Sequence, residues 1–183
     1  MSAATRRHLV LVGLMGAGKT TVGRVCAERL ARPFTDTDDV VVAAAGASVA
    51  DIFAAEGEPG FRARERLAVA DVCASPTPLV IACGGGAPLD PDNRRLLHEH
   101  GVVVWLEAPP RVLAARVAGS DDRPLLAGDA PGALERLHAL REPAYAAVAH
   151  VRVDTDGCTP DDVATRVLEQ YEAQRHADQR SVS

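Results

Sequence analysis

The sequence predicts an α/β protein of three layers, in which a central five-stranded parallel sheet lies between two layers of helices. Two observations support this prediction. Short apolar runs alternate along the chain with longer stretches of helical periodicity, which is the pattern of a parallel sheet covered by helices. A glycine-rich loop at residues 13–20 joins the first apolar run to the first helical stretch. Since 183 residues suit one compact unit, we expect a single domain over residues 1–183.

Strands are predicted at residues 9–12, 34–35, 79–83, 102–106 and 151–153. Helices are predicted at residues 18–31, 48–53, from 59 past 72, 91–100, 110–117, 132–149 and from 160 onward. Three of these helices have recognisable starts. Ser48 and Asp51 have the spacing of a capping box, Asp90 precedes a first-turn proline, and Thr159 stands before Pro160 at the start of the last helix.

Two segments differ in composition from the predicted core elements. Residues 119–131 contain two glycines, two prolines and three aspartates between helices, so we expect a mobile lid there. Residues 175–183 are polar, and we expect a frayed tail.

Composition excludes several classes of protein and partner. A content of 47% hydrophobic and 25% charged residues is typical of a globular domain and not of a disordered chain or a coiled coil. The net charge of −5 provides no basic field for nucleic acid. No apolar stretch has the length of a membrane span. Arg6 and Arg7 before an apolar run resemble the start of a signal peptide, but glycines interrupt that run and argue against one. We expect a cytoplasmic monomer without nucleic-acid or membrane partners.

The cysteines agree with a reducing compartment. The four residues lie far apart without a C-x-x-C pair, so neither a zinc site nor a disulfide framework is expected. They are Cys26, Cys73, Cys83 and Cys158. We expect them to act as small buried hydrophobes.

Residues 13–20 read Gly-Leu-Met-Gly-Ala-Gly-Lys-Thr and match the phosphate-binding pattern G-x-x-x-x-G-K-[ST]. The glycines let backbone N–H groups turn toward an anion at a helix N-terminus, which favours negative charge. Lys19 is the only lysine among twenty Lys and Arg residues and is predicted to reach the β- and γ-phosphates, while Thr20 offers its hydroxyl to Mg²⁺. The residues predicted to bind the phosphates of ATP are Gly16, Ala17, Gly18, Lys19, Thr20 and Thr21.

The rest of the chain narrows the class of nucleotide-binding protein. A GTPase usually reads guanine with an N-K-x-D motif, and the chain has no second lysine. A motor or transport ATPase usually has a strand that ends in aspartate to help hold Mg²⁺, yet the strand at 79–83 ends in Cys83 and that at 102–106 stops before Glu107. Asp36, at the end of the second strand, is the better-placed carboxylate. Among the classes of P-loop protein, this leaves a kinase that phosphorylates a small molecule or a nucleotide.

Six segments, in the same order along the chain, resemble segments of the shikimate kinase family. Members of this family are P-loop small-molecule kinases of the nucleoside monophosphate kinase-like type. The segments are GLMGAGKTTVGR at 13–24, DTDD at 36–39, SVADIFAAEGEPGFRARE at 48–65, GGGAP at 84–88, DRPLL at 122–126 and REPAY at 141–145. The resemblance implies a P-loop kinase fold with a mobile lid. It also implies transfer of the ATP γ-phosphoryl group to the 3-hydroxyl of shikimate, toward chorismate and the aromatic amino acids.

The resemblance implies an acceptor site as well. Asp38 matches the aspartate that contacts the substrate hydroxyls, where a carboxylate orients the hydroxyl and accepts its proton; an ordinary helix N-cap is the alternative. Arg62 and Arg141 match two arginines that bind the substrate carboxylate, for which the bidentate guanidinium is suited. The glycines where the backbone approaches the substrate ring are Gly84, Gly85 and Gly86.

On the nucleotide side, Asp36 matches a position near the metal, which Thr20 shares. Arg116 matches an arginine that packs on adenine or contacts phosphate, with an ordinary surface arginine as the alternative. Arg123 matches the lid arginine that moves onto the phosphates on closure and acts in catalysis with Lys19 and Asp38. Cys158 stands where some relatives have an arginine in the adenine loop.

Two alternatives remain open. The same fold could phosphorylate another hydroxylated acid, such as an aminoshikimate- or gluconate-like substrate, because one pocket contact redirects a small acceptor. A nucleotide-binding regulator without turnover is the second alternative. The joint presence of Asp36, Asp38, Arg62, Arg123 and Arg141 argues against it, since a regulator needs only the phosphate loop.

Overall fold

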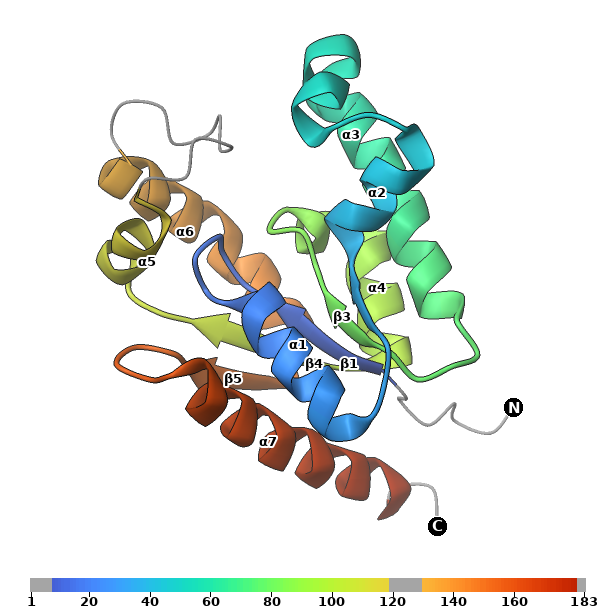
Figure 1. The fold of residues 1–183 in the computed structure, drawn as a ribbon, viewed down its shortest axis with the longest axis vertical. Helices are drawn as coiled ribbons and strands as arrows, with labels where there is room; N and C mark the ends of the chain where they lie inside the picture. The colour runs from blue at the N-terminus through green and yellow to red at the C-terminus, as the bar shows by residue number, and fades with distance from the viewer. Residues whose placement is uncertain (1–7, 119–129, 181–183) are drawn as a thin grey trace.

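A computed structural model, which describes residues 8–118 and 130–180, contains a five-stranded parallel sheet between layers of helices (Figure 1). The strands lie in the order β2-β3-β1-β4-β5, and every neighbouring pair is parallel. They are β1 (His8–Val12), β2 (Phe34–Asp36), β3 (Val80–Ala82), β4 (Gly101–Glu107) and β5 (Val151–Asp154). The predicted three-layer fold with five parallel strands is confirmed.

The helices cover both faces of this sheet. On one face α1 (Lys19–Leu30) packs against α7 (Pro160–Arg180), and on the other α4 (Pro91–His100) contacts both α3 (Val49–Ala74) and α6 (Ala130–Val148) (Figure 1). The remaining elements are α2 (Thr37–Ala45), the short 3-10 helix η1 (Ala87–Leu89) and α5 (Pro110–Val117). In the described parts of the chain no single helix is long and apolar enough to cross a bilayer; α2 and α3 pass that test only as a pair, which is bent by 93°.

Local signals set the helix starts as the sequence predicts. The Ser48 hydroxyl accepts a hydrogen bond from the Asp51 N–H, and the Asp51 carboxylate accepts one from the Ser48 N–H, which completes a capping box. Asp90 caps α4 through the N–H groups of Asp92 and Asn93. The two helices predicted on either side of residue 57 are both present within α3, and Gly57 between them is not helical, with φ of 67° and ψ of −175°.

Most strand and helix boundaries differ from the predictions by one or two residues, and α2 was not among the predicted helices. Three of the differences concern the tail, the lid and the edge of the sheet. Helix α7 continues to Arg180, where a frayed tail from 175 was expected, because Arg175 packs over the buried Tyr171 ring within the helix. Helix α6 begins at Ala130, so residues 130 and 131 belong to a helix and not to the lid. Glu107 is the last residue of β4, since it pairs with Asp154 of β5. The rest of the predicted lid lies outside the described residues.

The central strand anchors the site. All five residues of β1 are buried, because β3 and β4 flank the strand and helices cover both of its faces. The carboxyl ends of parallel strands lie at one edge of the sheet, so the loops after β1, β2 and β3 open on the same side. That edge holds the residues predicted to be functional.

Candidate active site

The loop of residues 13–20 joins β1 to α1 and packs closely on its neighbours. Gly16 has a φ of 80°, and a Cβ atom there would lie 2.9 Å from the Leu113 carbonyl oxygen of α5. Only glycine meets both constraints without strain. The Lys19 ammonium donates hydrogen bonds to the carbonyl oxygens of Gly13 (2.9 Å) and Leu14 (3.0 Å), so its charge lies over the loop that is predicted to bind phosphate.

The two residues predicted to hold Mg²⁺ are in contact. The Thr20 hydroxyl donates to Asp36 Oδ2 at 2.9 Å. The other carboxylate oxygen of Asp36 accepts the Asp38 N–H at 3.1 Å and caps α2. The N-cap is therefore Asp36, and the alternative that assigned this role to Asp38 is wrong. Neighbouring hydroxyl and carboxylate oxygens are hard ligands beside a phosphate loop, and they fit a magnesium ion.

A second cluster surrounds the glycines that follow β3. A Cβ atom on Gly84 would lie 2.5 Å from Asp38 Oδ1 and 2.9 Å from Glu65 Oε1, and one on Gly85 would lie 3.0 Å from an Arg141 terminal nitrogen. A Cβ atom on Gly86 would overlap the Arg62 guanidinium. The structure thus brings the predicted acceptor residues together around a backbone segment that has no room for side chains.

Charged groups in this cluster are partly paired and mostly buried. Arg62 donates to Glu65 Oε2 at 2.8 Å and to Glu58 Oε1 at 3.0 Å. Within the described chain, Glu65 Oε1 and Arg141 Nε are buried without a hydrogen-bond partner. Buried polar atoms without partners are costly in a folded protein, so these two atoms lower the stability of the ligand-free chain.

The protonation of the carboxylates follows from their burial. Burial raises the pKa of Asp38, and the nearby Asp36 raises it further, while Lys19 and Arg62 oppose the shift. Burial also raises the pKa of Glu65, against the opposing charge of Arg62. Lys19 is therefore close enough to Asp38 to act on its charge, which connects the phosphate loop with the acceptor cluster.

Three residues of the cluster were missed by the sequence reasoning. Glu65 follows Arg62 by three residues on the same helix, and this i, i+3 spacing was the signal that could have found it. Thr37 accepts the Gly84 N–H at 2.8 Å, and Tyr145 donates to the Gly85 carbonyl at 2.6 Å. Thr37 and Tyr145 act through tertiary contacts, which leave no local pattern in the sequence.

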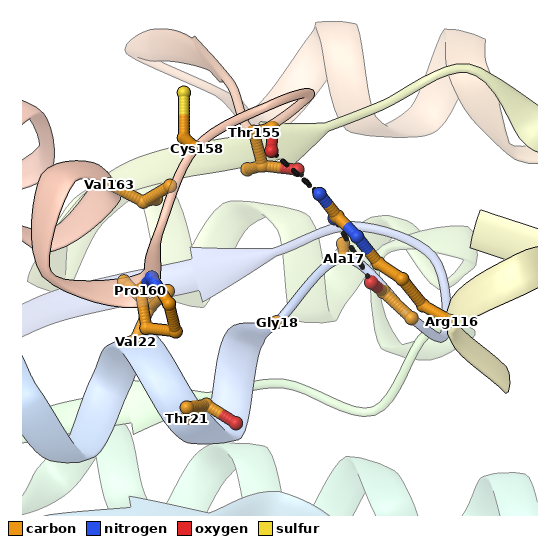
Figure 2. A pocket seen from close by; sticks show the side chains of 10 residues that line it. Ala17, Gly18, Thr21, Val22, Arg116, Thr155, Cys158, Pro160 and Val163 are labelled. Atoms are coloured by element: carbon orange, nitrogen blue, oxygen red, sulfur yellow. Dashed lines mark hydrogen bonds between the residues drawn. The ribbon is translucent and has the colours of Figure 1, made fainter. Parts of the chain in front are cut away.

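A pocket of about 330 Å³ opens beside the phosphate loop (Figure 2). Its lining comes from the loop, from α1, from α5, from the segment that joins β5 to α7 and from the start of α7. The lining residues are Gly16, Ala17, Gly18, Thr21, Val22, Arg116, Thr155, Cys158, Pro160 and Val163. Arg116 lines this pocket and is exposed there, and it donates to Thr155 and to the Gly16 carbonyl. Arg123 lies outside the described residues.

A phosphate loop that adjoins a cluster of buried charged side chains at the open edge of a parallel sheet is typical of a P-loop kinase for a small molecule. Comparison with known proteins identifies the kinase family. The chain belongs to the shikimate kinase family, because the family model described as shikimate kinase matches residues 15–172.

Individual relatives agree with this assignment. A shikimate kinase of Symbiobacterium thermophilum is 53% identical over 90% of this chain and 96% of that protein. One of Dechloromonas aromatica is 46% identical over 91% of each. Among solved structures, shikimate kinase from Acinetobacter baumannii in complex with shikimate superimposes with a TM-score of 0.88 at 38% identity, over 93% of this chain and 96% of that chain. The relatives confirm the predicted family.

Asp38→Asn tests the cost of the buried carboxylate. The pKa of Asp38 is higher in the folded chain than in the unfolded chain, so the folded state binds more protons at pH values between the two. Above the folded-state pKa, the charged carboxylate therefore lowers the free energy of unfolding. The variant is expected to have a larger free energy of unfolding at pH 7 and kinase activity reduced by about 100-fold. Chemical denaturation at pH 7 and at pH 4 is the measurement. The stability gain should shrink at the lower pH; a variant less stable than wild type at pH 7 contradicts the account.

Cys158 is predicted to be the thiol that reacts first with N-ethylmaleimide. Cys26, Cys73 and Cys83 are buried, and burial raises the pKa of each, to about 11 for Cys26 and about 12 for Cys73. Cys158 is half-buried and lines the pocket beside the phosphate loop, so ADP should slow its modification. Mass spectrometry of peptides from treated protein measures the order, and Cys158→Ser is the control that should lose the fast reaction. Equal rates with and without saturating ADP would place the nucleotide elsewhere.

Proposed function

We propose that this chain transfers the γ-phosphoryl group of ATP to the 3-hydroxyl of shikimate, giving shikimate 3-phosphate and ADP. The observation that supports the acceptor most strongly is the convergence of Arg62 and Arg141 on the glycines that follow β3. Two guanidinium groups favour an acid over a neutral sugar. The buried Glu65 Oε1 lies in the same cluster and is proposed to accept a hydrogen bond from a substrate hydroxyl.

The proposed reaction uses the two halves of the site together. The 3-hydroxyl oxygen attacks the γ-phosphorus, the bond from phosphorus to the ADP oxygen breaks, and the hydroxyl proton passes to Asp38. A carboxylate with a raised pKa is a stronger base for this step. Lys19 and the loop N–H groups stabilise the charge on the phosphates, and Arg123 of the lid is proposed to join them on closure.

Thr20 and Asp36 are proposed to hold Mg²⁺, with Asp36 acting through water. A magnesium ion held there would supply positive charge that offsets the negative charge developing on the phosphates. The base of ATP is proposed to lie in the pocket beside Arg116, since that pocket continues from the phosphate loop at Gly16 and Gly18. The reaction is proposed to serve the pathway to chorismate in the cytoplasm.

The direct test is ADP release by the purified protein with Mg-ATP. Shikimate, quinate and gluconate are supplied in turn, and we expect release with shikimate only. Release with another acid alone would keep the kinase mechanism and change the acceptor, which is the open alternative of an aminoshikimate- or gluconate-like substrate. Binding of ATP without turnover of any acid would favour the regulatory alternative.

Arg141→Lys tests the assignment of the acceptor carboxylate. Lysine keeps the charge but loses the planar pair of donors, so the KM for shikimate should rise by about tenfold, which corresponds to one charge-assisted hydrogen bond of roughly 1.5 kcal/mol. The KM for ATP should stay within about twofold of the wild-type value.

Arg64→Lys is the matched control, because Arg64 is ion-paired with Glu56 on the exposed side of α3 and should leave both constants unchanged. Steady-state kinetics with each substrate varied in turn gives the comparison. An equal rise of both KM values in Arg141→Lys would show that the acceptor site is misplaced.

A further inference from the structure

Thr155 lies directly after β5 and is almost completely buried, with 2% of its surface exposed. It makes two contacts with the guanidinium of Arg116. One Arg116 nitrogen donates to the Thr155 hydroxyl at 2.9 Å, and the other donates to the Thr155 carbonyl at 2.6 Å. Figure 2 shows both interactions at the edge of the pocket beside the phosphate loop.

The direction of the threonine hydroxyl is fixed by a third residue. The Thr155 hydroxyl donates to the Glu107 carbonyl at 3.0 Å, and the Thr155 N–H donates to the same oxygen at 2.8 Å. With its hydrogen committed to Glu107, the hydroxyl has only lone pairs to offer Arg116. A guanidinium is a donor without acceptor capacity, so the geometry suits both partners.

These hydrogen bonds fix the position and orientation of the Arg116 guanidinium. Arg116 has a long flexible side chain that would lose rotamer freedom on contact with a ligand. Thr155 orders it beforehand, and the contact of Arg116 with the Gly16 carbonyl at 3.4 Å ties it to the phosphate loop. Figure 2 shows Arg116 on one side of the pocket and Pro160 with Val22 on the other, an arrangement that suits a flat heterocycle between them.

We propose that Thr155 is a positioning residue for the nucleotide base: it holds Arg116 as one side of the base pocket, and so raises the affinity for nucleotides without affecting the affinity for base-free polyphosphates. This inference rests on the proposed function, in which the nucleotide base occupies this pocket. Preorganisation of a charged side chain lowers the entropic cost of binding, which is the source of the expected gain.

Thr155→Val tests the proposal, because valine keeps the shape of the side chain and removes the hydroxyl. The Glu107 carbonyl retains the bond from the backbone N–H of residue 155, so the change leaves no buried carbonyl orphaned. Calorimetric titration with ADP and with inorganic tripolyphosphate compares the wild type, Thr155→Val and the matched control Thr155→Ser. We expect Thr155→Val to weaken ADP binding by about tenfold, or ~1.4 kcal/mol, with tripolyphosphate unchanged and the serine variant close to wild type.

The same titrations in an Arg116→Ala background show whether the two residues act as one unit. Adding Thr155→Val to that background should cause no further loss of ADP affinity. Equal weakening of ADP and tripolyphosphate, an additive loss in the double variant, or full affinity in Thr155→Val would each overturn the proposal. If Thr155→Val does not fold, Thr155→Ala is measured in its place against the same predictions. Failure of the wild type to bind ADP would instead refute the proposed function.

Discussion

The proposed acceptor site, the cluster of charged side chains around the glycines that follow β3, depends on the absence of side chains at residues 84–86. Asp38 comes from α2, Glu65 from α3 and Arg141 from α6, and these three side chains come together over the backbone that follows β3. A single methyl group on Gly84 would collide with the first two of these side chains. The hydrogen bonds from the Gly84 N–H to Thr37 and from Tyr145 to the Gly85 carbonyl hold the turn in place. The charged side chains fill the space that the glycines leave, so the glycines are what allows the charges to meet.

Burial of these charged groups, which the proposed function needs, lowers the stability of the ligand-free protein. Glu65 is 1% exposed and Arg141 is 5% exposed, and each has one polar atom that finds no hydrogen-bond partner in the part of the chain described. An arrangement of this kind costs free energy in the empty protein. If the proposed carboxylate-bearing substrate supplies partners for both atoms, part of its binding free energy arises from removing this penalty. The raised pKa of Asp38 has the same origin, since the burial that destabilises its charge also makes it a better base.

Much of the fold and half of the site could be predicted from local sequence. The strands and all α-helices except α2 follow from apolar periodicity and caps. The contact of Thr20 with Asp36 follows from the rule that parallel strands end at one edge of the sheet. The roles of Tyr145 and Thr155 could not be predicted, because each acts through a residue distant in sequence, Gly85 and Arg116 respectively. The end of α7 was misplaced for a related reason, since polar composition does not show that Tyr171 is buried.

The central claim is that shikimate binds beside the charged side chains that converge on the glycines after β3. Calorimetric titration of shikimate into the wild type and into Gly84→Ala tests it most directly, with ADP binding and thermal unfolding as controls for the fold. The account predicts that the wild type binds shikimate and that Gly84→Ala has no detectable affinity for it, while ADP affinity is retained, because the added methyl displaces Asp38 and Glu65. Equal shikimate affinity in the two proteins would contradict the account.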